Sequence, residues 1–171
     1  MTIREYGFTA HERSYTLRMD LDMAEPSEAW IEYHFATHKC LYEPEVSLFM
    51  IACLRPGDVV IDVGANVGFF SIFMANLVGD KGKVLAFECG PTILPKLRHN
   101  LGLNWWLKNI EVIAQPLWCR AEPVTHWTSS DGHGGSCLWD PGLYHDNPNS
   151  RKNPQPAEMM ATTLELHRSI T

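Results

Sequence analysis

The chain has 171 residues, of which 45% are hydrophobic, and this is enough for one domain with a substantial core. Its formal net charge is -6 and no Lys/Arg cluster offsets it, which argues against a nucleic-acid partner. The five cysteines are scattered, form no C-x-x-C pair, and are expected to be reduced thiols without disulfide or metal roles. No apolar run approaches the ~20 residues of a membrane span, and the N-terminus lacks the apolar core of a signal peptide. These features predict a cytoplasmic protein.

The first 58 residues contain weak signals followed by two helical patterns. Residues 1–26 are mixed and polar, with one weak alternation at Tyr15–Met19 that predicts a short strand. Apolar spacing predicts a helix from Ser27 to about Lys39. A second helix is expected from Pro44 to Leu54, because a proline suits the first turn and the apolar residues share one face.

Strand and helix patterns alternate between residues 59 and 114. Strands are predicted at Val59–Val63, Val84–Phe87 and Ile110–Ala114, the first two as continuous apolar runs typical of strands covered on both faces. Helical spacing at Phe69–Val78 and Pro91–Leu103 fills the two intervals. This order predicts a parallel sheet with helical crossovers.

The alternation ends after residue 114. Short antiparallel strands are predicted at 124–127 and 136–139, and four prolines among asparagines predict a long polar loop or lid at 140–156. A last strand is expected at 159–164.

The turn Gly64–Gly68 comes between the first predicted strand and its helix. Its small residues let the backbone approach a ligand, and the helix start offers free N–H groups at the carboxyl end of a parallel strand. The dinucleotide motif G-x-G-x-x-G does not fit, because Asn66 occupies its second glycine position. Asp62-x-Gly64-x-Asn66-x-Gly68 fits better with the D/E-x-G-x-G-x-G loop of class I S-adenosyl-L-methionine (SAM) methyltransferases. A plain strand–helix turn is the alternative.

Three further residues extend this candidate site. Glu88 ends the second strand, where an acid can accept both ribose hydroxyls of a nucleoside; a solvated strand end is the alternative. Cys89 is expected at the edge of the cofactor, unless it is only a buried thiol. Gln115, just past the third strand, is expected to read the adenine ring, unless it is an ordinary loop residue.

The combined motifs resemble the FkbM family of methyltransferases. The resemblance covers roughly residues 40–166 and is carried by DVGANVGFFSIFMA, GKVLAFECGP, RHNLGLN, NIEVIAQPLW, GHGGSCLW and ATTLEL. It implies SAM as the cofactor and O-methylation of a sugar, lipid or polyketide-like small molecule. By this resemblance Gly64, Ala65, Asn66 and Gly68 hold the methionine end of SAM, and Glu88 holds the ribose.

The resemblance also suggests a role for Glu43. This residue precedes the second helix and is a candidate partner for the methionine ammonium group; the alternative is that it only stabilises its own helix dipole. Two departures are visible. Glu88-Cys89-Gly90 replaces the family's usual EPN or EPD, and Thr163-Leu164-Glu165 replaces TLD without the IDVEG-type strand that normally follows.

The expected fold is therefore α/β, a Rossmann-like class I methyltransferase three-layer sandwich that is partial. It contains strands 1–3 of the parallel sheet and a small antiparallel extension. Residues 1–40 are expected to form a polar, helical extension, and residues 41–171 the SAM-binding domain, incomplete at its C-terminal end. The first strand then becomes an apolar edge, which a second copy of the chain is expected to cover if no further segment does.

Three functions remain open from the sequence. The first is a SAM-dependent O-methyltransferase, the second a SAM-binding remnant without turnover, and the third an NAD-dependent oxidoreductase. His126, His133 and His145 are candidate bases by residue type alone, with exposed loop histidines as the alternative, so no catalytic base is assigned.

Overall fold

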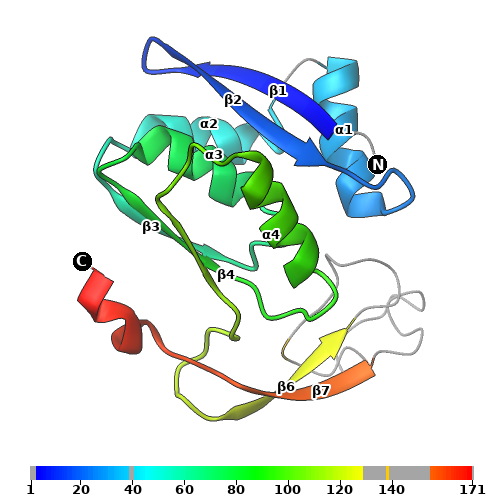
Figure 1. The fold of residues 1–171 in the computed structure, drawn as a ribbon, viewed down its shortest axis with the longest axis vertical. Coiled ribbons are helices and arrows are strands. Elements are labelled where there is room, and N and C mark those ends of the chain that lie inside the picture. The colour runs from blue at the N-terminus through cyan, green and yellow to red at the C-terminus, as the bar shows by residue number, and fades with distance from the viewer. Residues whose placement is uncertain (1–2, 39–40, 129–137, 139–154, 171) are drawn as a thin grey trace.

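The computed structural model describes residues 3–38, 41–128, 138 and 155–170. A hairpin and two helices come first, and a strand–helix–strand–helix–strand unit and an antiparallel strand pair follow (Figure 1). The strands are β1 (Ile3–Ala10), β2 (Arg13–Asp20), β3 (Val59–Val63), β4 (Lys83–Phe87), β5 (Ile110–Ile113), β6 (Pro123–Thr128) and β7 (Gln155–Met160). The helices are α1 (Pro26–His38), α2 (Pro44–Cys53), α3 (Phe69–Val78), α4 (Leu94–Leu103) and the 3-10 helix η2 (Leu164–Ile170).

The central sheet is parallel, in the order β3-β4-β5, with Val59 opposite Lys83 and Val84 opposite Ile110. The crossover helices α3 and α4 both pack on the face of the sheet that carries Val84 and Ala86. β6 and β7 pair antiparallel and form the small extension. The predicted Rossmann-like α/β fold, with three parallel strands and an antiparallel addition, is confirmed.

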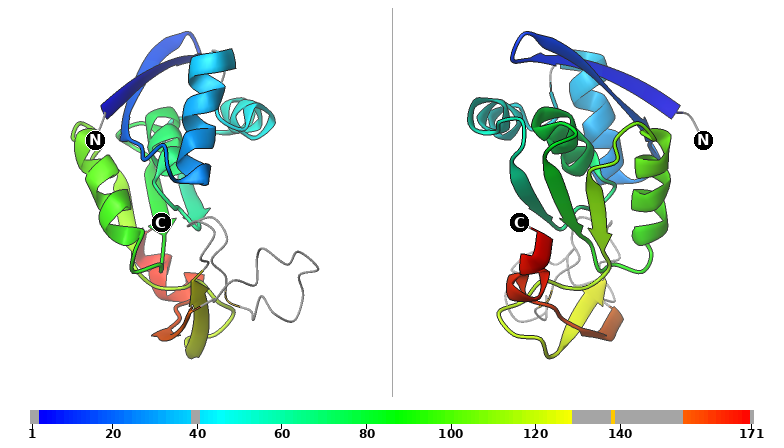
Figure 2. Two further views of the ribbon diagram at one scale, coloured as in Figure 1. Left: turned by 90° about the vertical axis from the view of Figure 1, so that its right-hand side faces the viewer. Right: turned by 60° about the vertical axis from the view of Figure 1, so that its left-hand side comes forward.

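The N-terminal hairpin packs on the outer side of α3 (Figure 2). Tyr6, Phe8 and Ala10 alternate inward along β1, and the Phe8 and Phe73 ring centroids lie 4.5 Å apart. The layers are therefore the sheet, the helices, and the hairpin with α1. Residues 3–38 share one hydrophobic core with the start of α3, although the sequence predicts an extension over 1–40.

The sequence analysis missed β1 and predicted only the middle of β2. The hairpin turns at His11 and Glu12, which have φ values of 48° and 61°. Two-residue hairpin turns require positive φ and usually signal it with Asn-Gly or Asp-Gly. Because neither residue belongs to those types, the sequence carries no local signal for the turn.

Two boundaries in the structure differ from those that the sequence predicts. α4 begins at Leu94 rather than Pro91, because Pro95 fits the first turn of a helix but not its interior. The last strand is Gln155–Met160 rather than 159–164, so residues 155–156 belong to a strand and not to the predicted loop. The strand expected at 136–139 lies outside the described residues except for Leu138, as does the loop from 140 to 154.

β3 lies at the edge of the sheet, as predicted. Val59, Ile61 and Val63 point away from the helices and are 42%, 42% and 63% exposed. In the part of the chain that the structure describes, no strand pairs with the free side of β3. Within the same residues, no helix is both long enough and apolar enough to cross a membrane.

Candidate functional site

The turn Gly64–Gly68 joins β3 to α3 and has an unusual backbone. Gly64, Asn66 and Gly68 all have positive φ, at 79°, 51° and 94°. The N–H groups of Gly64 and Ala65 both donate to the carbonyl of Phe87, at 2.9 Å each. The turn is therefore fastened to the carboxyl end of β4, which is the edge where open α/β sheets bind ligands.

The Glu88 carboxylate lies directly against this turn. Its Oε2 accepts the N–H of Asn66 at 2.8 Å, and its Oε1 accepts the N–H of Gly90 at 2.7 Å. The expected proximity of the strand-end acid and the glycine turn is confirmed. Because an ionised carboxylate can accept about four hydrogen bonds, each oxygen keeps capacity for a ligand hydroxyl.

A cavity of about 270 Å³ opens between the turn, α1 and the start of α2. Its polar lining includes Glu43, Asp62 and Asn66, and none of the described residues that line it is a lysine or an arginine. The Asn66 Oδ1 is buried and has no hydrogen-bond partner in the described structure. The cavity therefore suits a cationic group that is also hydrogen-bonded. Ser27, Ile31, Tyr42, Gly64, Ala65, Val67, Phe69 and Phe70 complete the lining.

Backbone strain points to the same cavity. Four described residues other than glycine have positive φ, and two of them form the β1–β2 turn. The other two are Glu43, at 44°, and Asn66, at 51°, and both line this cavity. Such conformations cost about 1–3 kcal/mol and cluster where a ligand or reaction needs them. We treat this cavity as the candidate site for that reason.

Asp62 is held by the first turn of α3. Its Oδ2 accepts the Ser71 hydroxyl at 2.5 Å. Burial raises the pKa of the Asp62 carboxyl above its usual range, the Glu88 charge adds to this rise, and hydrogen bonds from Ser71 offset part of it. Asp62 therefore both ties β3 to α3 and presents a carboxylate to the cavity.

The raised pKa of Asp62 predicts that Asp62→Asn stabilises the fold at neutral pH. The Asp62 carboxyl keeps its proton to higher pH in the folded protein than in the unfolded chain. The stability of the folded protein therefore falls as pH rises past about 3.9 and through the folded pKa. The asparagine side chain cannot ionise, so the variant avoids this loss of stability, and each ~1 kcal/mol regained raises Tm by roughly 2–4 °C. Thermal unfolding between pH 3 and 8 measures it. A variant that is less stable than wild type at pH 7, with a gap that widens as pH rises, would contradict this account.

Cys89 and Gln115 do not line the cavity. Burial raises the pKa of the half-buried Cys89 thiol to about 11, with a smaller contribution from Glu88. Gln115 donates from Nε2 to the Met160 carbonyl at 3.3 Å and so faces the C-terminal segment. Their proposed contacts with the nucleoside remain predictions.

His126 is not the exposed loop histidine that the sequence allowed. It lies in β6, is 3% exposed, and its Nδ1 has no partner in the described structure. Burial lowers the pKa of its imidazole, which favours the neutral form. His133 and His145 lie outside the described residues.

The sequence analysis missed the part of the cavity that α1 supplies. Ser27 and Ile31 line the cavity from that helix, and Tyr42 joins them from the segment before α2. No motif marks these positions, because they reach the site only when α1 packs beside the turn. Helical spacing at Ile31 showed a buried face but not what it faces.

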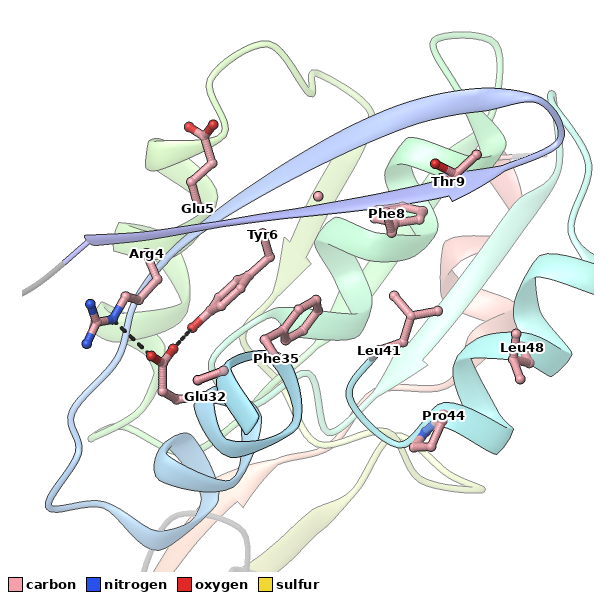
Figure 3. A pocket seen from close by; sticks show the side chains of 12 residues that line it. Arg4, Glu5, Tyr6, Phe8, Thr9, Glu32, Phe35, Leu41, Pro44 and Leu48 are labelled. Carbon is pink, nitrogen blue, oxygen red and sulfur yellow. Dashed lines mark hydrogen bonds and ion pairs between the residues drawn. The ribbon is translucent and has the colours of Figure 1, made fainter. Parts of the chain in front are cut away.

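A second cavity, of about 710 Å³, lies between β1, α1 and residues 41–48 (Figure 3). Phe35 and Leu41 form part of its apolar wall. At one end Tyr6 donates to Glu32, and Arg4 forms an ion pair with Glu32 at 3.3 Å. These contacts fasten β1 to α1. No residue of the glycine turn lines this space, so it is separate from the candidate site.

Comparison with known proteins finds methyltransferases over part of the chain. No family model matches. A segment of 85 residues is 33% identical to Methyltransferase sdnD of Sordaria araneosa, covering 48% of this chain and 32% of that protein. A segment of 47 residues is 53% identical to 31-O-demethyl-FK506 methyltransferase FkbM of Streptomyces tacrolimicus, covering 28% and 18%. Another match, 43% identical over 47 residues, is an uncharacterized RNA methyltransferase of Streptomyces avermitilis, covering 28% and 11%.

The chain therefore spans about a third or less of the length of these relatives. Among solved structures, a SAM dependent methyltransferase from Aquifex aeolicus has a TM-score of 0.41 and 23% identity, covering 55% of this chain and 47% of that one. At this TM-score the likeness adds no weight of its own. The fold assignment rests on the strand order and on the crossover helices.

Proposed function

We propose that this chain binds SAM at the Gly64–Gly68 turn and serves as the donor-binding part of a SAM-dependent methyltransferase. The observation that carries the proposal is the charge of the cavity beside the turn. Two carboxylates, Glu43 and Asp62, line it, and a third, Glu88, lies against the turn from β4. When bound, SAM supplies an electrophilic methyl group on a positively charged sulfur.

The residues present fit this cofactor. Glu43 and Asp62 match the ammonium group of its methionine part, and the buried, unpartnered Asn66 Oδ1 offers a further acceptor. Glu88 has acceptor capacity for two ribose hydroxyls. We assign the nucleobase edge to Cys89 and Gln115 from their places after β4 and β5.

The same charges argue against an NAD-dependent oxidoreductase. A dinucleotide brings a pyrophosphate with two negative charges to the turn, where backbone N–H groups and a helix N-terminus normally receive it. Here the N–H of Asn66 already donates to Glu88, and carboxylates line the space beside the turn. A pyrophosphate would therefore meet like charge, whereas a sulfonium and an ammonium would meet opposite charge.

We further propose O-methylation of a small hydroxylated acceptor, such as a sugar, a lipid or a polyketide-like molecule. The family resemblance and the printed name of the Streptomyces tacrolimicus relative support this class. Other relatives are named RNA methyltransferases, but the net charge of -6 disfavours a phosphate backbone as partner. The FkbM-type activity and its acceptor belong to this proposal.

Isothermal titration calorimetry with S-adenosylhomocysteine tests the proposed function, with NADH as the competing ligand. We expect saturable heat with S-adenosylhomocysteine and none with NADH. Folded protein that binds NADH alone, or neither ligand, would overturn the proposal. If S-adenosylhomocysteine binds but no methyl transfer occurs across sugars and hydroxylated lipids, the chain is a SAM-binding remnant, which the exposed face of β3 also favours.

The exposed strand edge leads to a separate prediction on oligomeric state. A second copy that covers β3 would bury Val59, Ile61 and Val63, and natural proteins avoid leaving such an edge open. We expect a dimer by size-exclusion chromatography with multi-angle light scattering, and a shift toward monomer in Ile61→Lys. A monomer at all concentrations would contradict the prediction.

A further inference from the structure

Asn100 connects the ligand-binding turn to the N-terminal hairpin. It lies on α4 and is fully buried, with 0% of its surface exposed. Its Nδ2 donates to the carbonyl of Val67 at 2.9 Å, and its Oδ1 accepts the N–H of Asp20 at 2.9 Å. One amide group therefore satisfies two backbone groups from segments 47 residues apart.

The contact with Val67 holds the turn on the side away from the sheet. Contacts from the β4 side come from the Phe87 carbonyl and the Glu88 carboxylate. The bond from Asn100 fixes the carbonyl of the peptide between Val67 and Gly68, and Gly68 is the N-cap residue of α3. The turn is thus held from both sides, with its last peptide oriented by a side chain of α4.

Loss of this bond would leave a buried carbonyl without its partner. Val67 is only 2% exposed, so water has little access to replace the amide. An unsatisfied buried backbone group is costly, and the least costly response is rotation of the Val67–Gly68 peptide. That rotation would change the surface against which the ligand lies, because Val67 and Asn66 both line the cavity.

We propose that Asn100 is a positioning residue for the cofactor: it holds the Val67–Gly68 peptide in the orientation that SAM binding requires. This inference rests on the proposed function and adds to it a residue that makes no contact with the cavity itself. Its role is therefore separable from direct ligand contact and from general packing of α4.

Asn104, the C-cap residue of α4 four positions later, provides a matched control. It is also fully buried, its Nδ2 donates to the Arg18 carbonyl at 2.7 Å, and its Oδ1 accepts the Arg18 N–H at 2.8 Å. Both asparagines therefore bind the backbone of the hairpin strand β2. Of the two, Asn100 is the one that also binds the turn.

The test compares Asn100→Asp with Asn104→Asp. The Asp side chain at 100 can still accept the Asp20 N–H but places an oxygen opposite the Val67 carbonyl. We expect both variants to have a lower Tm, and Asn100→Asp alone to bind S-adenosylhomocysteine about tenfold more weakly, since one hydrogen bond is replaced by a repulsive contact. Affinity is measured by calorimetry at a temperature where both variants are folded.

The pH dependence provides a readout that a purely structural role would not move. Protonation restores a donor at position 100, so the affinity deficit of Asn100→Asp relative to wild type should shrink as pH falls from 9 to 6. The ionisable groups beside this position are Asp20 and His99, which pair at 3.2 Å, and the Lys96–Glu28 ion pair, and all three proteins contain them. Their contribution is removed by reference to wild type and to Asn104→Asp at each pH.

The outcomes separate the two proposals. If wild type does not bind S-adenosylhomocysteine, the proposed function fails and takes the positioning role with it. If wild type binds and the two variants lose affinity equally, or Asn100→Asp binds like wild type at every pH, only the role of Asn100 is overturned. Should Asn100→Asp fail to fold, Asn100→Ser replaces it. The serine is uncharged and too short to reach the Val67 carbonyl, so we again expect about tenfold weaker binding of S-adenosylhomocysteine, measured at a single pH.

Discussion

Glu88→Ala is expected to weaken S-adenosylhomocysteine binding by about 100-fold or more. Without the carboxylate, the ribose hydroxyls of the ligand lose two charge-assisted hydrogen bonds, each worth about 1.5–3 kcal/mol. The N–H groups of Asn66 and Gly90, which donate to Glu88 at 2.8 and 2.7 Å, also lose their partner. Calorimetry measures the loss. The matched control is Glu111→Ala, which removes a carboxylate from the neighbouring strand β5, where it pairs with Lys83 at 2.8 Å.

A ligand-side experiment distinguishes direct contact from rearrangement of the turn. An S-adenosylhomocysteine analogue without the 2′ and 3′ hydroxyls should bind wild type weakly. Glu88→Ala should bind this analogue nearly as well as wild type does, because the hydroxyls that Glu88 would contact are absent. This is a double-mutant cycle in which the ligand carries the second change. If Glu88→Ala binds both ligands as wild type does, the ribose assignment is wrong. Equal losses with both ligands would mean that Glu88 acts only through the turn.

Gly68→Ala is expected to destabilise the protein by about 2–5 kcal/mol. Gly68 has a φ of 94°, which costs a residue with a side chain about 1–2 kcal/mol. A methyl group there would lie 2.8 Å from the Leu97 Cδ1, and overpacking adds about 1–3 kcal/mol. The fully buried Leu97 side chain would have to shift to make room for the methyl group. Thermal unfolding should show a fall in Tm of roughly 5–15 °C.

Gly64→Ala is the control for this prediction. Its φ of 79° imposes similar backbone strain, but an added methyl group meets nothing within 4 Å. We expect a stability loss of only about 1–2 kcal/mol. Since Gly64 lines the cavity, its methyl group should lower ligand affinity more than it lowers stability. Equal stability losses at the two positions would show that contact with Leu97 is not the cause.

The turn and its flanking elements could be predicted from the sequence because their signals are local. The apolar run Val59–Val63 and the small residues after it define a strand and a bend, and helix α3 has the predicted bounds Phe69–Val78. Glu88 could be placed near the turn because parallel neighbouring strands end at the same edge of the sheet. The chain order of the strands was therefore enough to bring the acid and the turn together.

The rest of the site depends on contacts between distant segments. Ile31 and Tyr42 line the cavity only because the hairpin, α1 and α3 share one core, and no spacing rule in the sequence connects them. The contact of Gln115 with the C-terminal segment has no local signal either, because its Nε2 donates to the carbonyl of Met160, 45 residues away in the chain. The burial of His126 likewise depends on tertiary packing, because all of β6 pairs with β7 and only this residue of the strand is buried.

The sequence by itself determined the parallel strands, the crossover helices, the glycine turn and the acid beside it, because each depends on residues close in the chain or on strand order. Tertiary structure alone decided which further surfaces enclose the turn: α1 and Tyr42 on one side, and Asn100 of α4 on the other. The physical reason is that burial and hydrogen bonding between remote segments depend on how the elements pack, and local patterns do not specify that packing.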